Sequence, residues 1–234
     1  MAADRKLIKA VRAALKEAAD PSKAPGMQAY MKSVMPYLGV MAGPQRKATG
    51  EVFKTHPLPD FETWRDTALA LWRDAEFREE RYAAQDLLGH RLYKTHQTPA
   101  CMPMYEELVV DGAWWDHVDD IAVHRVGPLL LAFRDEIEPI MRAWSADEDM
   151  WKRRTSIICQ VGAKAEIDLA LLYDCIEPNM ADKEFFIRKA IGWALRQHAW
   201  LNPGEIERYV TANADRLSGL SKREALKNIG KLRK

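Results

Sequence analysis

Apolar residues recur at helical spacing along most of the chain. In the first such segment, residues 4–19, the apolar positions are Leu7, Ile8, Val11 and Leu15, three or four residues apart. The same spacing predicts further helices over residues 27–35, 44–55, 61–74, 76–93, 104–110, 114–126, 129–144, 146–161, 166–176, 183–200 and 204–213, and a basic helix from residue 221. No segment shows the sustained alternation of a β-strand. The pattern therefore predicts an all-α fold.

Short links rich in proline and glycine separate the predicted helices. Gly127-Pro128 predicts a break between the helices over 114–126 and 129–144. Ser145 and Ser221 are each followed three residues later by glutamate, which is the capping-box pattern of a helix start. The Glu/Arg-rich start of the segment 76–93 is predicted to face solvent.

Taken two at a time, these helices form units of about 35–45 residues, the length range of HEAT-type helical pairs. We find no clean repeated motif, so the repeats are degenerate. The sequence predicts a superhelical solenoid that forms one domain over residues 1–234 and presents a concave surface.

Charge is distributed unevenly, although the formal net charge is only +1. Residues 1–57 hold 10 lysines and arginines against 4 acidic residues, and residues 183–234 hold 12 against 5. The middle, residues 58–182, holds 13 against 25. Two basic ends around an acidic middle can bind a polyanion at both ends, or they can be solvated surface of uneven charge. Charge alone leaves both interpretations open.

Several classes of protein do not fit the sequence. The three cysteines are odd in number and lack metal-type spacing, which disfavours a disulfide framework and favours a reducing cytoplasm. The N-terminus lacks an apolar signal segment, and the apolar runs are too short to span a membrane. No phosphate loop, paired-histidine metal helix or serine-hydrolase elbow occurs, so we expect no metal and no cofactor. Together with the cysteines and the short apolar runs, this predicts a cytoplasmic protein with no membrane association.

The richest local chemistry lies in the stretch from Ala113 to Asp120, which combines two adjacent tryptophans with three carboxylates. In a helix, Trp115 and Asp119 stand four residues apart and share one face. An aromatic ring beside a carboxylate suits an electron-poor sugar or a cationic base. The alternative is a packed tryptophan and a capping aspartate. Trp114 and Val118 lie about 100° away around the helix and are expected to pack.

Several segments resemble bacterial DNA alkylation repair glycosylases of the AlkD type. They are Trp114–Asp119, Trp151–Arg154, Phe185–Arg196 and Leu220–Ala225. The resemblance spans most of the chain and is strongest from about residue 105 onward. It implies a HEAT-like superhelix that cradles duplex DNA and removes cationic N3- and N7-alkylated purines, acting as a monomer in the bacterial cytoplasm or nucleoid.

The resemblance also implies roles for particular residues. The implied catalytic residues are Asp119, Trp115 and Trp193. The implied DNA-binding residues are Arg154, expected to anchor a phosphate, with Arg196, Arg188, Lys189 and Tyr30. In the first repeat the segment Ala29–Lys32, with Tyr30, resembles the family's early aromatic position, whereas the loop over residues 39–44 departs from the family pattern.

Cleavage of an N-glycosidic bond builds positive charge on the sugar. An alkylated purine is already cationic and leaves without protonation, so one carboxylate that stabilises the sugar and aligns water is sufficient. Asp119 fits that role, and tryptophan faces suit the cationic nucleotide. Two alternatives remain: a non-catalytic HEAT-like scaffold that binds branched DNA or a protein partner, and a protein-binding solenoid indifferent to DNA.

Overall fold

The computed structural model describes residues 3–232, and all regular secondary structure in that range is helical. The all-α prediction is therefore confirmed for the described residues. The chain forms two compact units, one ending at Gln97 and one beginning at Thr98. A single domain over residues 1–234 stays a prediction. No helix of the described range is long and apolar enough to cross a bilayer.

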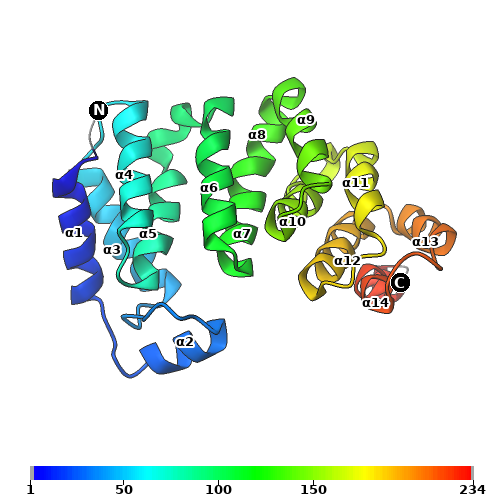
Figure 1. Cartoon of the computed structure of the whole chain (residues 1–234), viewed down its shortest axis with the longest axis horizontal. Coiled ribbons are helices and arrows are strands. Elements are labelled where there is room, and N and C mark those ends of the chain that lie inside the picture. The colour runs from blue at the N-terminus through cyan, green and yellow to red at the C-terminus, as the bar shows by residue number, and fades with distance from the viewer. Residues whose placement is uncertain (1–2, 233–234) are drawn as a thin grey trace. The chain divides into compact units, whose positions relative to one another are not determined.

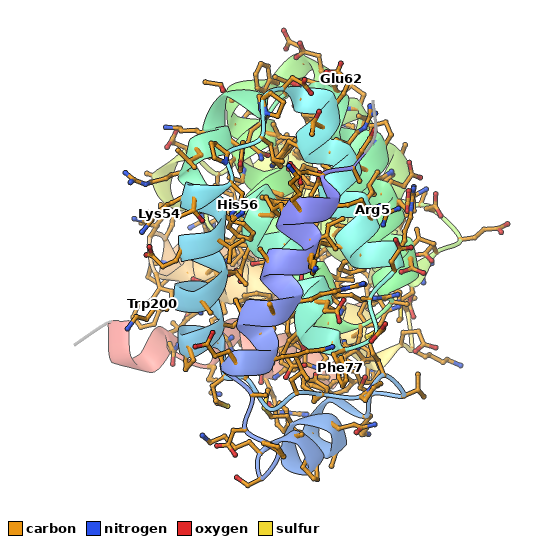
Figure 2. The ribbon with its side chains drawn as sticks, turned by 90° about the vertical axis from the view of Figure 1, so that its left-hand side faces the viewer. Arg5, Lys54, His56, Glu62, Phe77 and Trp200 are labelled. Atoms are coloured by element: carbon orange, nitrogen blue, oxygen red, sulfur yellow. The ribbon has the colours of Figure 1, made fainter. Side chains whose placement is uncertain are left out.

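The first unit is a group of antiparallel helices. Its helices are α1 (Arg5–Glu17), α2 (Ala24–Met31), α3 (Ala42–Thr55), α4 (Phe61–Arg73) and α5 (Arg78–Leu88), followed by a 3-10 helix, η1 (Arg91–His96). Within this unit α1, α3, α4 and α5 pack together, whereas α2 lies beyond their ends (Figure 1). Figure 2 shows α1 in front, with Arg5 at its start and Lys54 near the end of the neighbouring α3.

The start of α5 corrects the prediction of a solvated segment. Arg78, Glu79 and Glu80 are all buried. The carboxylate of Glu79 accepts hydrogen bonds of 2.9–3.1 Å from the three backbone N–H groups of residues 38–40. Glu80 pairs with Arg12 at 2.7 Å. A buried loop needs acceptors for its N–H groups, and a carboxylate supplies strong ones. The charged side chains at the start of α5 therefore bind groups within the protein and do not face solvent.

The second unit begins with a 3-10 turn, η2 (Pro99–Cys101). Its α-helices are α6 (Met102–Gly112), α7 (Trp115–Ile121), α8 (Gly127–Ala132), α9 (Arg134–Ser145), α10 (Met150–Ile158), α11 (Leu169–Ile176), α12 (Phe185–Ala199), α13 (Pro203–Ala212), α14 (Gly219–Leu226) and α15 (Ile229–Leu232). Two further 3-10 turns are η4 (Lys164–Glu166) and η5 (Glu177–Asn179). Helices close in sequence pack as pairs, such as α6 with α7, α9 with α10 and α12 with α14. The prediction of HEAT-like helical pairs is confirmed.

The predicted break at Gly127-Pro128 is wrong. The helix that starts at Trp115 continues through a π-helical turn over Ala122–Val126 into α8, and the chain bends only at Phe133. Pro128 lies directly after this π-helical turn. There the Gly127 N–H bonds to the Ala122 carbonyl, five residues back, so the regular i→i−4 pattern is already interrupted where the proline N–H is missing. A Cβ on Gly127 would lie 2.3 Å from the carbonyl oxygen of Cys159. The glycine therefore permits close packing and does not end the helix.

Both predicted capping boxes are also wrong. Ser145 is the last residue of α9, and α10 begins after Asp149, whose carboxylate accepts from the N–H groups of its first turn. Ser221 lies inside α14, which is capped by Ser218 through a 3.0 Å hydrogen bond to the Ser221 N–H. Asp149 and Ser218 are equally good N-caps, so local sequence did not decide between neighbouring acceptors.

Candidate functional site

An ion pair between Asp119 and Arg154 joins α7 to α10 in the second unit. The Arg154 Nε donates to Asp119 Oδ1 at 2.7 Å, and Nη2 donates to Oδ2 at 2.8 Å. The Arg154 Nη1 donates to the Phe186 carbonyl oxygen of α12 at 2.6 Å. The Arg154 side chain is only 4% exposed and that of Asp119 19%. One guanidinium thus fixes a carboxylate that keeps part of its surface open.

Local sequence explains why Asp119 stands at this place. Ala113 adopts a left-handed conformation, with φ of 37°, and ends α6. The next residue, Trp114, is extended, and α7 begins at Trp115. Asp119 follows one turn later on the face of Trp115, as the spacing predicts. Both side chains are half-buried.

An aromatic cluster supports the ion pair. The ring centroids of Trp114 and Phe186 are 5.4 Å apart, those of Trp151 and Phe186 5.0 Å, and those of Trp114 and Trp151 6.3 Å. The Arg154 guanidinium carbon lies 5.8 Å from the centre of the Phe186 ring. Trp114 therefore packs, as predicted, and Val118 is fully buried. A supporting role for Trp151 or Phe186 was not among the predictions from the sequence.

Burial dominates the electrostatics of Asp119. Loss of hydration raises the pKa of its carboxyl above the ordinary value, and the negative charge of Asp116 acts in the same direction. The two hydrogen bonds and the positive charge of Arg154 oppose this rise. Arg154 is therefore the group that favours the ionised carboxylate at this buried position.

A second group of predicted residues lies on α12. Lys189, Trp193 and Arg196 follow one another at intervals of four and three residues, so they share one face of the helix. Trp193 is half-buried. The Lys189 Nζ lies 2.8 Å from Glu224 Oε1, and Arg196 pairs with Glu224 Oε2. The face continues from the turn of Phe186, whose carbonyl binds Arg154.

The remaining predicted residues have other surroundings. Arg188 is half-buried, and its carbonyl accepts from the Ser221 hydroxyl at 2.9 Å. Tyr30 belongs to the first unit and is 75% exposed at the end of α2. Arg154 is buried against Asp119, so its geometry is that of a positioning group. Its predicted phosphate contact, like the DNA contacts of the other residues, stays a prediction.

Close packing of α12 on α14 depends on Gly192. A Cβ at this position would lie 2.5 Å from the Glu224 Cβ and 2.9 Å from the Ser221 carbonyl oxygen. Gly192→Ala should therefore overpack the contact and lower the free energy of unfolding by about 1–3 kcal/mol. Urea unfolding measures this change.

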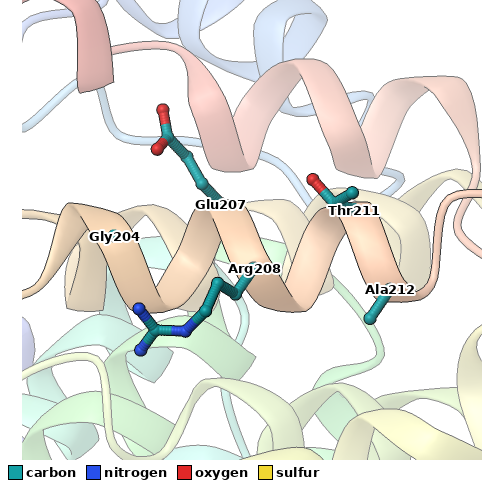
Figure 3. A pocket seen from close by; sticks show the side chains of 5 residues that line it. All are labelled: Gly204, Glu207, Arg208, Thr211 and Ala212. Carbon is teal, nitrogen blue, oxygen red and sulfur yellow. The ribbon is translucent and has the colours of Figure 1, made fainter.

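Gly204→Ala is the matched control. Gly204 lies in the first turn of α13, where a Cβ would come no closer than 3.7 Å to the Arg208 guanidinium. Figure 3 shows it on the helix face that it shares with Glu207, Arg208, Thr211 and Ala212. Alanine is the better helix former, so Gly204→Ala should leave stability unchanged or raise it slightly. An equal loss in both variants would contradict the packing argument.

Comparison with known proteins agrees with this architecture. The model of the DNA alkylation repair enzyme family matches residues 11–229. Among solved structures, a predicted DNA alkylation repair enzyme from Enterococcus faecalis superposes with a TM-score of 0.81 at 29% sequence identity, covering 91% of this chain and 97% of that one. No curated protein matches the chain. The family match covers nearly the whole sequence, and the chain therefore belongs to the DNA alkylation repair enzyme family.

Proposed function

We propose that this protein is a DNA glycosylase that hydrolyses the N-glycosidic bond of cationic N3- and N7-alkylated purines in duplex DNA. The observation that carries the proposal is the Asp119 carboxylate, which a buried arginine holds at both oxygens and which stays partly exposed beside Trp115. A fixed and partly desolvated anion can stabilise positive charge that develops in front of it.

The reaction needs few groups. The bond between the purine nitrogen and the sugar carbon breaks, and its electron pair leaves with the alkylated base, which becomes neutral. Positive charge moves to the deoxyribose, where Asp119 stabilises it. Asp119 also aligns a water molecule, whose oxygen bonds to the sugar carbon as its proton passes to solvent. No general acid and no cofactor take part, because the leaving base is already cationic.

The tryptophans add selectivity for charge. Trp115 and Trp193 present electron-rich ring faces to the deoxyribose and the cationic nucleotide, and each such contact contributes roughly 0.5–2 kcal/mol. The attraction grows as the sugar becomes positive, so it lowers the activation barrier in addition to strengthening the binding of the substrate. Three of the five N–H groups of Arg154 are engaged by Asp119 and Phe186, so in this proposal Arg154 holds the carboxylate in place.

Trp193→Leu should slow base release by roughly 3- to 30-fold, the kinetic equivalent of the lost ring contact. The measurement is the single-turnover rate at saturating protein, with the melting temperature as a check on folding. Trp200→Leu is the control, since Trp200 lies beyond the end of α12 and is 52% exposed. A non-catalytic scaffold predicts that neither substitution changes the interaction with DNA.

The function itself is tested by incubating the protein with a duplex that carries one 7-methylguanine or 3-methyladenine. Release of the free methylated base, with none from the unmodified duplex, supports a glycosylase. Tight duplex binding without release favours the scaffold. Binding should weaken as salt increases, since lysines and arginines displace counterions from the phosphates. We also propose that the protein acts as a monomer in the cytoplasm, which sedimentation and cell fractionation can test.

A further inference from the structure

Glu224 occupies an unusual place for an acidic residue in a basic segment. Residues 183–234 carry 12 lysines and arginines and only 5 acidic residues. Glu224, on α14, directs its two carboxylate oxygens to two of those cations, Lys189 and Arg196, both on α12. Its side chain is only 13% exposed, whereas Lys189 and Arg196 are 39% and 20% exposed. The carboxylate of Glu224 is therefore more buried than the two cations that it binds.

The contact between α12 and α14 places Glu224 where its carboxylate pairs with both cations. Gly192 lies between Lys189 and Arg196 in sequence, and the stem of Glu224 rests directly on it. A side chain at residue 192 would displace Glu224. Lys189 and Arg196 are seven residues apart, which is about 10 Å along a helix. Trp193 lies between them, on the same face.

The surroundings of Glu224 favour the ionised form of its carboxyl group. Hydrogen bonding from Lys189 holds the pKa of the Glu224 carboxyl below its ordinary range, with further lowering by the charges of Lys189, Arg196 and Lys227. An ionised, mostly buried carboxylate is costly to leave without a partner. Separating both cations from Glu224 is therefore costly when they bind another anion. Each has several N–H groups, so each can contact Glu224 and an outer anion together.

We propose that Glu224 is a positioning residue of the DNA interface. It holds Lys189 and Arg196 on either side of Trp193, so that the two cations bind backbone phosphates flanking the nucleotide that Trp193 contacts. This inference rests on the proposed function, because it takes duplex DNA as the outer anion. Glu224 touches no reacting atom in this account. Its effect on the reaction is to set where the damaged strand lies.

Glu224→Gln tests this role through two separate readouts. With the carboxylate neutral, the cations are no longer held, and the rate of base release at saturating protein should fall on the order of 10-fold because the strand is misplaced. Binding of an unmodified duplex should instead become tighter, and its dependence on salt steeper by up to about one counterion. Slower chemistry with tighter binding is not what a loss of folding produces.

Asp215→Asn is the matched control, since it removes one negative charge from an exposed site of the same unit. It should leave the rate of base release unchanged. The decisive background is Lys189→Ala with Arg196→Ala, in which Glu224→Gln should have no further effect on rate or salt dependence. The proposal would be overturned if Glu224→Gln released base at the wild-type rate. It would also be overturned if Glu224→Gln had the same effect in the Lys189→Ala, Arg196→Ala protein as in the wild type.

The two readouts separate this proposal from the proposed function. If the wild-type protein releases no base but binds duplex DNA, the glycosylase fails, and the salt dependence alone decides the role of Glu224. If Glu224→Gln makes the salt dependence of duplex binding steeper only when Lys189 and Arg196 are present, the positioning role stands. If the wild-type protein does not bind duplex DNA, the positioning role is refuted as well.

Discussion

Replacing Arg154 by glutamine is expected to lower the free energy of unfolding by about 3–5 kcal/mol at neutral pH, because it leaves the carboxylate of Asp119 buried without its counter-charge. The same change removes the hydrogen bonds and the positive charge that oppose the rise in the pKa of Asp119. The pKa of Asp119 should therefore rise further above its ordinary value. Activity that needs the ionised carboxylate should then appear only at higher pH.

Two measurements follow the sign of this effect. The acidic limb of the pH–rate profile should lie at higher pH in Arg154→Gln than in the wild type. The loss of stability should grow as pH rises through the raised pKa and shrink below it, since a protonated Asp119 buries no charge. Urea unfolding at several pH values checks the second point.

Arg153→Gln is the control for the Arg154 substitution. Arg153 precedes Arg154 on α10 and pairs with Asp182 at 3.0 Å, with no contact to Asp119 among the described ion pairs. Arg153→Gln removes one positive charge from α10, as Arg154→Gln does. An acidic limb that does not move in Arg154→Gln, or that moves equally in Arg153→Gln, would contradict the assigned role of Arg154.

The sequence predicted the helices well because their signal is local. The spacing of Leu7, Val11 and Leu15 reports a buried face, and α1 forms where that spacing places it. The failures arose where distant contacts decide. Gly127 permits the approach of the Cys159 carbonyl, and Glu79 binds N–H groups some 40 residues earlier in the chain. No local pattern distinguishes these residues from a helix break or a solvated acid.

The candidate site was predictable in part for the same reason. The interval between Trp115 and Asp119 lies within one helix, so spacing alone places them on one face. The partner of Asp119 is 35 residues away, on α10, and the resemblance to a family suggested Arg154 as a neighbouring phosphate anchor and not as the hydrogen-bond donor to Asp119. The third partner of Arg154 is the backbone carbonyl of Phe186. A backbone acceptor carries no side-chain signal, so only the fold could reveal it.

Asp119→Asn is expected to slow base release by roughly 10²- to 10³-fold, the usual cost of removing one group that stabilises charge in a transition state. The amide keeps the shape of the side chain and can still accept a hydrogen bond from Arg154, but it carries no negative charge. Duplex binding should change little, because a sugar cation is present only in the transition state. A cooperative thermal transition confirms that the variant is folded.

The most direct test of the account compares wild type, Asp119→Asn and Asp120→Asn on one duplex that contains 7-methylguanine. Asp120 is the adjacent carboxylate and pairs with Arg125 at 3.5 Å, so its substitution changes the same charge on the same helix. The measured quantity is the single-turnover rate of free-base release at saturating protein. We predict rapid release by the wild type and by Asp120→Asn, and release slowed by roughly 10²- to 10³-fold in Asp119→Asn. Wild-type release by Asp119→Asn, or no release by the wild type, would contradict the mechanism.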